Sequence, residues 1–308
     1  MMERIRIASR ESRLALWQAH HVADRLRARY SGLETDLVPM TTRGDQILHT
    51  TLAKIGGKGL FIKELEAALL EGRADIAVHS MKDVPAEMPE GLAVVSVLER
   101  ADPRDAFVSG RYGTLSDLPA GAVVGTSSLR RQAQVRHARP DLEIRPVRGN
   151  VETRLRKLDE GEYDAILLAC AGLERLGLAD RITDRIGLDV SLPAVGQAIV
   201  GIECSTGRPD LVDLLKGIES RNSRRAVDAE RSFAERLEGS CESPIAGHAV
   251  VTGDTLQLRG LVAAADGSEV LADEISGAAD DGRALGRTLA DRLLARGAGP
   301  LLASGAAL

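Results

Sequence analysis

Two residues of this 308-residue chain carry side chains that could take part in a reaction and lie where a ligand could reach them: Asp83 and Cys241. Asp83 follows the apolar run Ile76–Val78, adjoins Lys82 and precedes Pro85. The run predicts a short buried strand, and open α/β sheets bind ligands at the carboxyl ends of their strands. Asp83 is therefore the first candidate for chemistry.

Cys241 lies in the polar, turn-forming segment 238–244. A thiol gains nothing from burial in such a loop and is open to oxidation, which indicates reactivity or attachment; an incidental free thiol is an equal alternative. Cys170 and Cys204 each adjoin an apolar run and are interpreted as small core side chains. No Cys-x-x-Cys pair occurs, so neither a disulfide framework nor a zinc knuckle is predicted.

Lysine is rare in this chain and gathers around Asp83. Four of the six lysines fall in the window 54–85: Lys54, Lys58, Lys63 and Lys82. The ammonium group of lysine is a compact, rotatable charge, whereas the guanidinium group of arginine is planar and larger. The choice of lysine in this window therefore indicates a role for a compact positive charge. Glycines on both sides of Lys58 predict a flexible loop, but the spacing of a nucleotide phosphate loop is absent.

Arginines are concentrated in residues 125–156. Three hydroxyl residues, Thr126, Ser127 and Ser128, precede a helix predicted from Leu129, and we expect them to cap it. Its first turn holds Arg130 and Arg131, where the helix dipole disfavours cations. An anion sharing the site explains this pair better than a solvated basic face does. By the same pattern, three further arginines are predicted near strand ends: Arg148, Arg154 and Arg175.

The elements expected around these residues form α/β units. Polar and apolar residues alternate over 4–8, which predicts a strand. Arg10 and Ser12 follow it and lead into a predicted amphipathic helix. Charged or proline-containing stretches at 100–105 and 192–197 are interpreted as two crossings between lobes. After residue 222 the pattern changes to a helix, hairpin strands and a final helix near 281–294, and a frayed tail is expected after Gly297.

Composition excludes several classes of function. Aromatic residues are only 2% and the net charge is -5, which disfavours nucleic-acid binding. No run approaches a membrane span, and the N-terminus lacks the layout of a signal peptide, so a cytoplasmic protein is expected. No two histidines have metal-ligand spacing on one helix, and no metal is predicted.

Long motifs along nearly the whole chain resemble the porphobilinogen deaminase (hydroxymethylbilane synthase) family. They are Ile-Ala-Ser-Arg-Glu-Ser-Arg-Leu-Ala, Gly-Gly-Lys-Gly-Leu-Phe, Ala-Val-His-Ser-Met-Lys-Asp-Val-Pro, Gly-Thr-Ser-Ser-Leu-Arg-Arg-Gln, Arg-Gly-Asn-Val-Glu-Thr-Arg-Leu and Leu-Pro-Ala-Val-Gly-Gln. The resemblance implies an α/β fold with two periplasmic-binding-protein-like lobes, a double hinge and a small C-terminal α+β domain. The implied domains are 1–99 with 199–217, 104–193, and 221–308.

The resemblance also implies a transferase of tetrapyrrole and heme biosynthesis. It would join four porphobilinogen molecules head to tail on a dipyrromethane cofactor, release ammonia, and free linear hydroxymethylbilane by hydrolysis. The cofactor would be held as a thioether by Cys241. A monomer is expected, with the product handed to the next enzyme of the pathway.

Residue roles follow from the same resemblance. Asp83 matches the catalytic carboxylate and also a cofactor contact, Lys54 and Lys58 match an active-site loop, and Gln197 matches a hinge residue facing the site. The other cofactor contacts are Lys82, Thr126, Ser127, Ser128, Arg130, Arg131, Arg154 and Arg175. The substrate contacts are Arg10, Ser12, Arg148, Arg154 and Gln197, and Arg175 also matches a contact to substrate acetate and propionate groups.

Two positions depart from the family pattern. Ser240 replaces the middle glycine before the cysteine, and Ala198 replaces the glycine after Val-Gly-Gln, which is expected to stiffen the hinge. The rival hypothesis is a two-lobed module that binds an anion or senses an effector without catalysis. Fold alone does not separate the two, whereas a module of this kind needs neither Cys241 nor Asp83.

Overall fold

The computed structural model describes residues 3–42, 62–85, 87–239 and 243–305. The chain forms two compact units: unit 1 holds residues 1–100 and 199–224, and unit 2 holds 101–198 and 225–308. The division into three domains remains a prediction.

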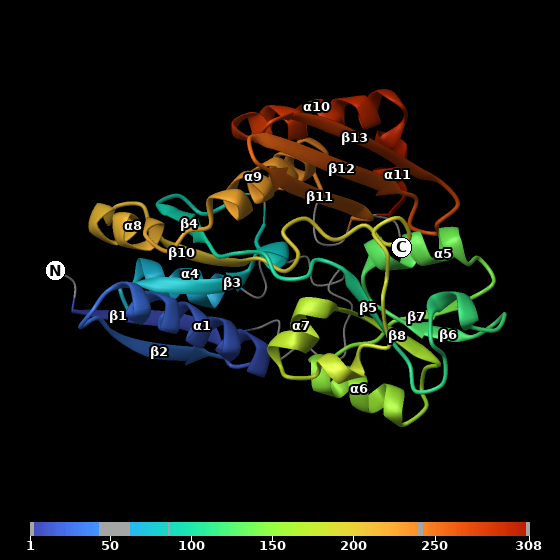
Figure 1. The fold of residues 1–308 in the computed structure, drawn as a ribbon, viewed down its shortest axis with the longest axis horizontal. Coiled ribbons are helices and arrows are strands. Elements are labelled where there is room, and N and C mark those ends of the chain that lie inside the picture. Colours follow the sequence, from blue (N-terminus) through green and yellow to red (C-terminus); the bar gives the residue numbers. More distant parts are fainter. Residues whose placement is uncertain (1–2, 43–61, 86, 240–242, 306–308) are drawn as a thin grey trace. The chain divides into compact units, whose positions relative to one another are not determined.

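Unit 1 is built on a five-stranded sheet in the order β2-β1-β3-β10-β4 (Figure 1). β1, β2 and β3 run parallel, and β10 is antiparallel to β3 and β4. The strands are β1 (Arg4–Arg10), β2 (Glu34–Met40), β3 (Ile76–Ser80), β4 (Leu92–Val97) and β10 (Val200–Ser205). The helices are α1 (Arg13–Arg29), α4 (Lys63–Leu70) and α8 (Pro209–Lys216).

Local sequence explains where the helices of unit 1 begin and end. Ser12 caps α1, because its hydroxyl accepts a hydrogen bond of 3.4 Å from Ala15 N. Gly72 follows α4 with φ +68°, a conformation that glycine adopts without steric cost, so the helix ends there. Both helices bury one apolar stripe against the sheet.

Unit 2 contains a second five-stranded sheet in the order β7-β6-β8-β5-β9. β6 is parallel to β7 and β8, and β5 is antiparallel to β8 and β9. The strands are β5 (Asp105–Val108), β6 (Val123–Gly125), β7 (Glu143–Arg145), β8 (Ala165–Ala169) and β9 (Asp184–Arg185). The helices are α5 (Leu129–Ala138), α6 (Val151–Asp159) and α7 (Cys170–Arg175).

The C-terminal part of unit 2 is a three-stranded antiparallel sheet, β11-β12-β13, with helices on one face (Figure 1). The strands are β11 (Ile245–Thr252), β12 (Thr255–Ala263) and β13 (Val270–Ala278). The helices are α9 (Arg221–Arg236), whose residues 221–224 belong to unit 1, α10 (Gly282–Ala295) and α11 (Ala298–Gly305). The predicted mixed α/β fold class, with a small C-terminal α+β part, is confirmed.

Sequence reasoning was wrong about the tail and missed a central strand. The stretch after Gly297 forms α11, because Ala298 is buried and Leu301 and Leu302 pack against the core of the three-stranded sheet. β5 was not predicted, since Ala106, Phe107 and Val108 are too few to show a period. β9 and α8 were missed as well. Among the described residues, no helix is both long and apolar enough to cross a membrane.

Candidate functional site

In unit 1, the predicted residues lie at the carboxyl edge of β1 and β3. Arg10 ends β1 and Ser12 caps the following helix, whereas β3 ends at Ser80 and continues into a short 3-10 helix, η1 (Met81–Asp83). Because β1 and β3 are parallel, their carboxyl ends share one edge of the sheet. Asp83 is exposed, and Lys82, Arg10 and Ser12 are partly buried. Gln18 of α1 steadies this edge by donating to Ser80 Oγ at 2.8 Å.

Three buried titratable side chains lie on neighbouring elements of unit 1: His79 on β3, Glu203 on β10 and Glu66 on α4. His79 Nε2 is 2.7 Å from Glu203 Oε2, and both side chains are enclosed. Glu66 of α4 is also buried, and burial, followed by the charge of Glu203, raises its pKa. These groups pack beneath α4 and do not include any predicted site residue.

In unit 2, the hydroxyl residues before α5 do not cap it as expected. Ser128, the residue at the cap position, makes no side-chain bond to the helix. The Thr126 hydroxyl instead accepts from Ser128 N at 3.2 Å, and Ser127 Oγ donates to Val147 O at 2.9 Å. These bonds hold the loop between β6 and α5 against the end of the neighbouring strand β7.

Arg130 and Arg131 are almost fully buried, and both bind Asp105. Arg130 forms a bidentate ion pair with the carboxylate, with Nη1 2.8 Å from Oδ2 and Nη2 3.1 Å from Oδ1. Arg131 Nη2 donates to Oδ1 at 2.7 Å. Asp105 begins β5, which is antiparallel to β8, so it lies at the carboxyl edge of β6 and β8. The anion predicted for this helix start is therefore supplied in part by the protein.

Two residues of the segment before β10 complete what we call the Asp105 cluster: Asp105, Arg130, Arg131, Ser191 and Gln197. Ser191 Oγ donates to Asp105 Oδ2 at 2.8 Å, and Gln197 Nε2 donates to Oδ1 at 2.9 Å. Burial by itself would raise the pKa of Asp105, but the two guanidinium groups outweigh it and hold that pKa well below its ordinary value.

Sequence reasoning missed Asp105 and Ser191. The signal that could have found Asp105 is the pair of arginines in the first turn of a helix, which requires a nearby negative charge. Its source could not be identified, because Asp105 is 25 residues from Arg130 in sequence.

The other predicted arginines follow two strands of the same sheet. Arg148 is partly buried after β7, and Arg154 Nε donates to Gly149 O at 2.8 Å. Arg175 Nη2 donates to Ala198 O at 2.7 Å, and burial lowers the pKa of Arg175 to about 10. Ala198 has φ +70°, a left-handed conformation that is uncommon for alanine.

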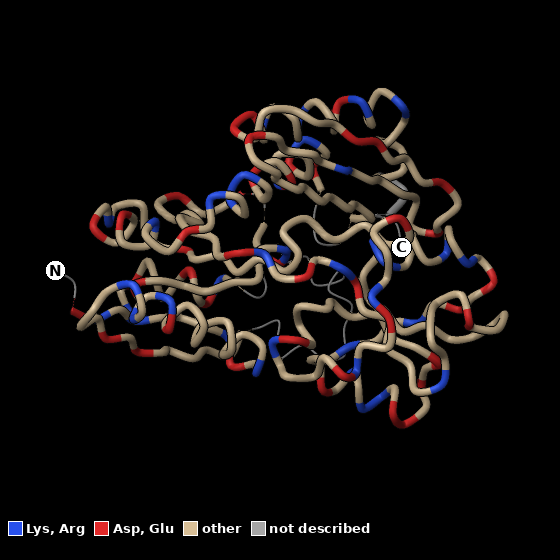
Figure 2. The backbone as a smooth tube through the Cα atoms, in the orientation of Figure 1, with Lys and Arg blue, Asp and Glu red and all other residues tan. Residues whose placement is uncertain are grey.

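The structure thus forms two sets of predicted residues, one in each unit. Unit 1 holds Arg10, Ser12, Lys82 and Asp83, and unit 2 holds Thr126, Ser127, Ser128, Arg130, Arg131, Arg148, Arg154, Arg175 and Gln197. Lys54, Lys58, Ser240 and Cys241 lie outside the described residues. Figure 2 shows basic and acidic positions interleaved along each unit.

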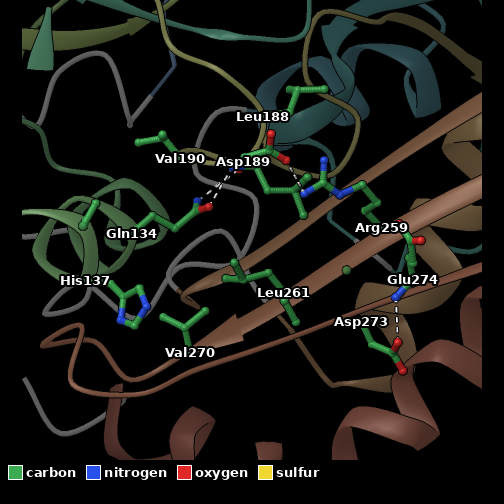
Figure 3. A pocket seen from close by; sticks show the side chains of 14 residues that line it. Gln134, His137, Leu188, Asp189, Val190, Arg259, Leu261, Val270, Asp273 and Glu274 are labelled. Atoms are coloured by element: carbon green, nitrogen blue, oxygen red, sulfur yellow. Dashed lines mark hydrogen bonds and ion pairs between the residues drawn. The ribbon is translucent and has the colours of Figure 1, made fainter. Parts of the chain in front are cut away.

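A cavity of about 450 Å³ lies beside α5, and the predicted site residues do not line it. It is lined by the later half of α5, the segment 188–192, β12 and β13 (Figure 3). Asp189 and Arg259 form an ion pair of 2.9 Å across its rim. Gln134 joins α5 to the segment, since Leu192 N donates to its Oε1 at 2.7 Å.

In the described part of the chain, no group of three or more His, Cys, Asp and Glu side chains could hold a metal ion.

Comparison with known proteins agrees with this organisation. Residues 5–213 match the family described as porphobilinogen deaminase, dipyrromethane cofactor binding domain, and residues 225–295 match its C-terminal domain. The porphobilinogen deaminase of Chromobacterium violaceum is 57% identical over 303 residues, which cover 98% of either chain.

Two solved structures show weaker similarity. The periplasmic VFT2 domain of BvgS from Bordetella pertussis is 15% identical with a TM-score of 0.44, covering 70% of this chain and 86% of that one. The aliphatic sulphonate binding protein SsuA from Escherichia coli is 17% identical with a TM-score of 0.41, covering 77% and 70%. The family matches and the near full-length relative show that the chain is an enzyme of the porphobilinogen deaminase family with a dipyrromethane cofactor.

Proposed function

We propose that the chain is a hydroxymethylbilane synthase, which condenses four porphobilinogen molecules head to tail. In each condensation the C–N bond of the aminomethyl group breaks and ammonia leaves. A C–C bond then forms between that methylene carbon and the free α-carbon of the preceding pyrrole, which loses a proton. Water finally releases the linear tetrapyrrole. The dipyrromethane cofactor, attached to Cys241 as a thioether, supplies the first free α-carbon.

The charge of the Asp105 cluster is the observation that carries this proposal. Two buried guanidinium groups face one carboxylate, so one positive charge lacks a partner within the cluster. Arg130 Nε, Arg131 Nε and Gln197 Oε1 are buried without a hydrogen-bond partner among the described residues. A ligand rich in carboxylates and N–H groups, such as dipyrromethane, fits these unsatisfied donors and this acceptor.

Other predicted residues would complete the cofactor site. Lys82 and Asp83 in unit 1, and Thr126, Ser127, Ser128, Arg154 and Arg175 in unit 2, are the contacts we assign to it. Burial disfavours the positive charge of Arg175. A nearby acidic group of the ligand would stabilise that charge.

We assign catalysis to Asp83, whose exposed carboxylate stands at the carboxyl edge of β1 and β3. It would accept hydrogen bonds from pyrrole N–H groups and stabilise the positive charge that develops as ammonia leaves. Arg10, Ser12, Arg148, Arg154, Arg175 and Gln197 are assigned to the substrate's acetate and propionate groups. Lys54 and Lys58 are assigned to a loop that covers the site.

Intact-mass measurement of the purified chain tests the proposal. We expect a mass above that of the bare polypeptide by one thioether-linked dipyrromethane, an aldehyde-reagent colour, and the loss of both in Cys241→Ser. Arg13, an exposed residue of α1 that has no assigned role, offers a control variant, Arg13→Lys, which should keep both. A bare polypeptide mass for the active wild type would refute the thioether.

The partners of the enzyme follow from the same proposal. We expect a monomer in solution, measurable by light scattering, and hand-over of the product to the next enzyme of the pathway. A non-catalytic anion-binding module is not favoured, because the chain belongs to an enzyme family.

A further inference from the structure

We propose that Asp105 is a positioning residue of this enzyme, whose carboxylate orients Arg130 and Arg131 toward the acidic cofactor and ties them to the segment 191–197. This inference rests on the proposed function. Asp105 itself is fully enclosed and is not expected to touch the cofactor.

The first line of evidence is the number of donors that converge on Asp105. Its Oδ1 accepts from Arg130, Arg131 and Gln197, and its Oδ2 accepts from Arg130 and Ser191. Both oxygens are therefore used fully by the protein. A guanidinium held at two terminal nitrogens has a fixed plane, so its remaining Nε–H points in one direction.

The second line of evidence is that the carboxylate is itself fixed. Asp105 is paired with Ala169 in the ladder of β5 and β8, and its carbonyl accepts from Ile186 N at 2.9 Å. The preceding carbonyl, Arg104 O, accepts from Cys170 N at 3.1 Å. Backbone bonds on both sides of the strand therefore hold the Asp105 backbone in place without any contribution from α5.

The third line of evidence is the link to the segment 191–197. Arg130 Nη1 donates to Leu192 O at 2.6 Å, so one guanidinium bridges Asp105 and this segment. Gln134, one turn further along α5, binds both backbone groups of Leu192. Gln197 Nε2 also donates to Pro103 O at 2.7 Å. The first turn of α5, the start of β5 and the segment therefore share one network through Asp105.

The test compares Asp105→Asn with Asp102→Asn. Asp102 is a nearby partly buried aspartate that pairs with Arg104 and Arg185 and not with the arginines of α5. Three quantities are measured on the full chain: the fraction carrying cofactor by intact mass, KM and kcat per loaded chain, and Tm. We expect Asp105→Asn to lower the loaded fraction, or to raise KM for porphobilinogen, by about tenfold or more, the size of one charge-assisted hydrogen bond. Asp102→Asn should change neither.

The outcomes separate the two proposals. If wild type carries no cofactor and does not turn over porphobilinogen, the proposed function fails. If wild type is loaded and active, and Asp105→Asn loads and binds substrate normally with only Tm lowered, the positioning role is overturned. Should Asp105→Asn not fold, Ser191→Ala removes one bond to Oδ2 and keeps all charges. It should shift loading or KM a few-fold in the same direction, and wild-type values for both would overturn the inference.

Discussion

Asp83 and Asp105 occupy comparable places in the two units and have opposite environments. Each lies at the carboxyl edge of parallel strands, beside a basic residue in sequence and two residues from a proline. Asp83 is exposed, and no hydrogen bond or ion pair engages its carboxylate within the described ranges. Asp105 is fully buried and binds two arginines. The comparison teaches that enclosure and partners, rather than residue type, separate a carboxylate available to a ligand from one that positions other groups.

The largest effect is expected from removing the charge of Asp105. Asp105→Ala leaves two guanidinium groups buried without an anion, so we expect it to lower the free energy of unfolding by about 3–5 kcal/mol. Arg130→Leu should cost less, because it leaves Asp105 and Arg131 as a balanced pair. It should nevertheless impair cofactor loading. Urea denaturation with intact-mass analysis measures both, and equal stability loss in the two variants would contradict the charge argument.

Asp83→Asn should give the reverse pattern. Because one charge-stabilising group contributes about 10²–10³-fold to turnover, kcat should fall by about that factor or more. The free energy of unfolding should stay within about 0.5 kcal/mol of wild type, since the side chain is exposed. Steady-state kinetics on cofactor-loaded enzyme checks the first part. Near-normal turnover would rule Asp83 out as the catalytic carboxylate.

The smallest effect is expected at Glu66, a buried carboxylate without an arginine partner. Burial and the charge of Glu203 raise the pKa of Glu66 above its ordinary value of 4.5, while His79 and Lys63 oppose the shift. The folded state then holds the Glu66 proton more tightly than the unfolded state, so ionised Glu66 destabilises the fold at neutral pH. Glu66→Gln should therefore be slightly more stable than wild type at pH 7, with the gain shrinking as pH falls toward about 4.

The ionised carboxylate of Asp105 is expected to stabilise the fold, which is opposite to the effect expected for ionised Glu66. Its pKa is lowered from 3.8, so its contribution to stability is present above about pH 4 and declines on further acidification. Denaturation of Glu66→Gln and Asp105→Asn between pH 3 and about pH 7 should give stability differences of opposite sign relative to wild type. A destabilised Glu66→Gln at neutral pH would show that Glu66 is held in its charged form by contacts that favour it.

Much of the fold could be predicted from local patterns. The five consecutive small and apolar residues 165–169 favour a strand buried on both faces, and β8 occupies this range. The end of α4 is likewise indicated by a single residue, Gly72, because glycine adopts the left-handed conformation that stops a helix. The strand at Asp105 was not predicted, because a run of three apolar residues carries no period.

The sequence by itself determined the α/β order of elements, the family and the types of side chain available, since these depend on neighbours within a few residues. Only the tertiary structure decided which charges meet. From the sequence, Arg130 and Arg131 were interpreted as two cations that bind an anionic ligand. In the structure both bind Asp105, which also accepts a hydrogen bond from Gln197, 92 residues further along the chain. Such pairings arise because buried charges must find partners wherever the fold brings them, and sequence separation carries no information about that distance.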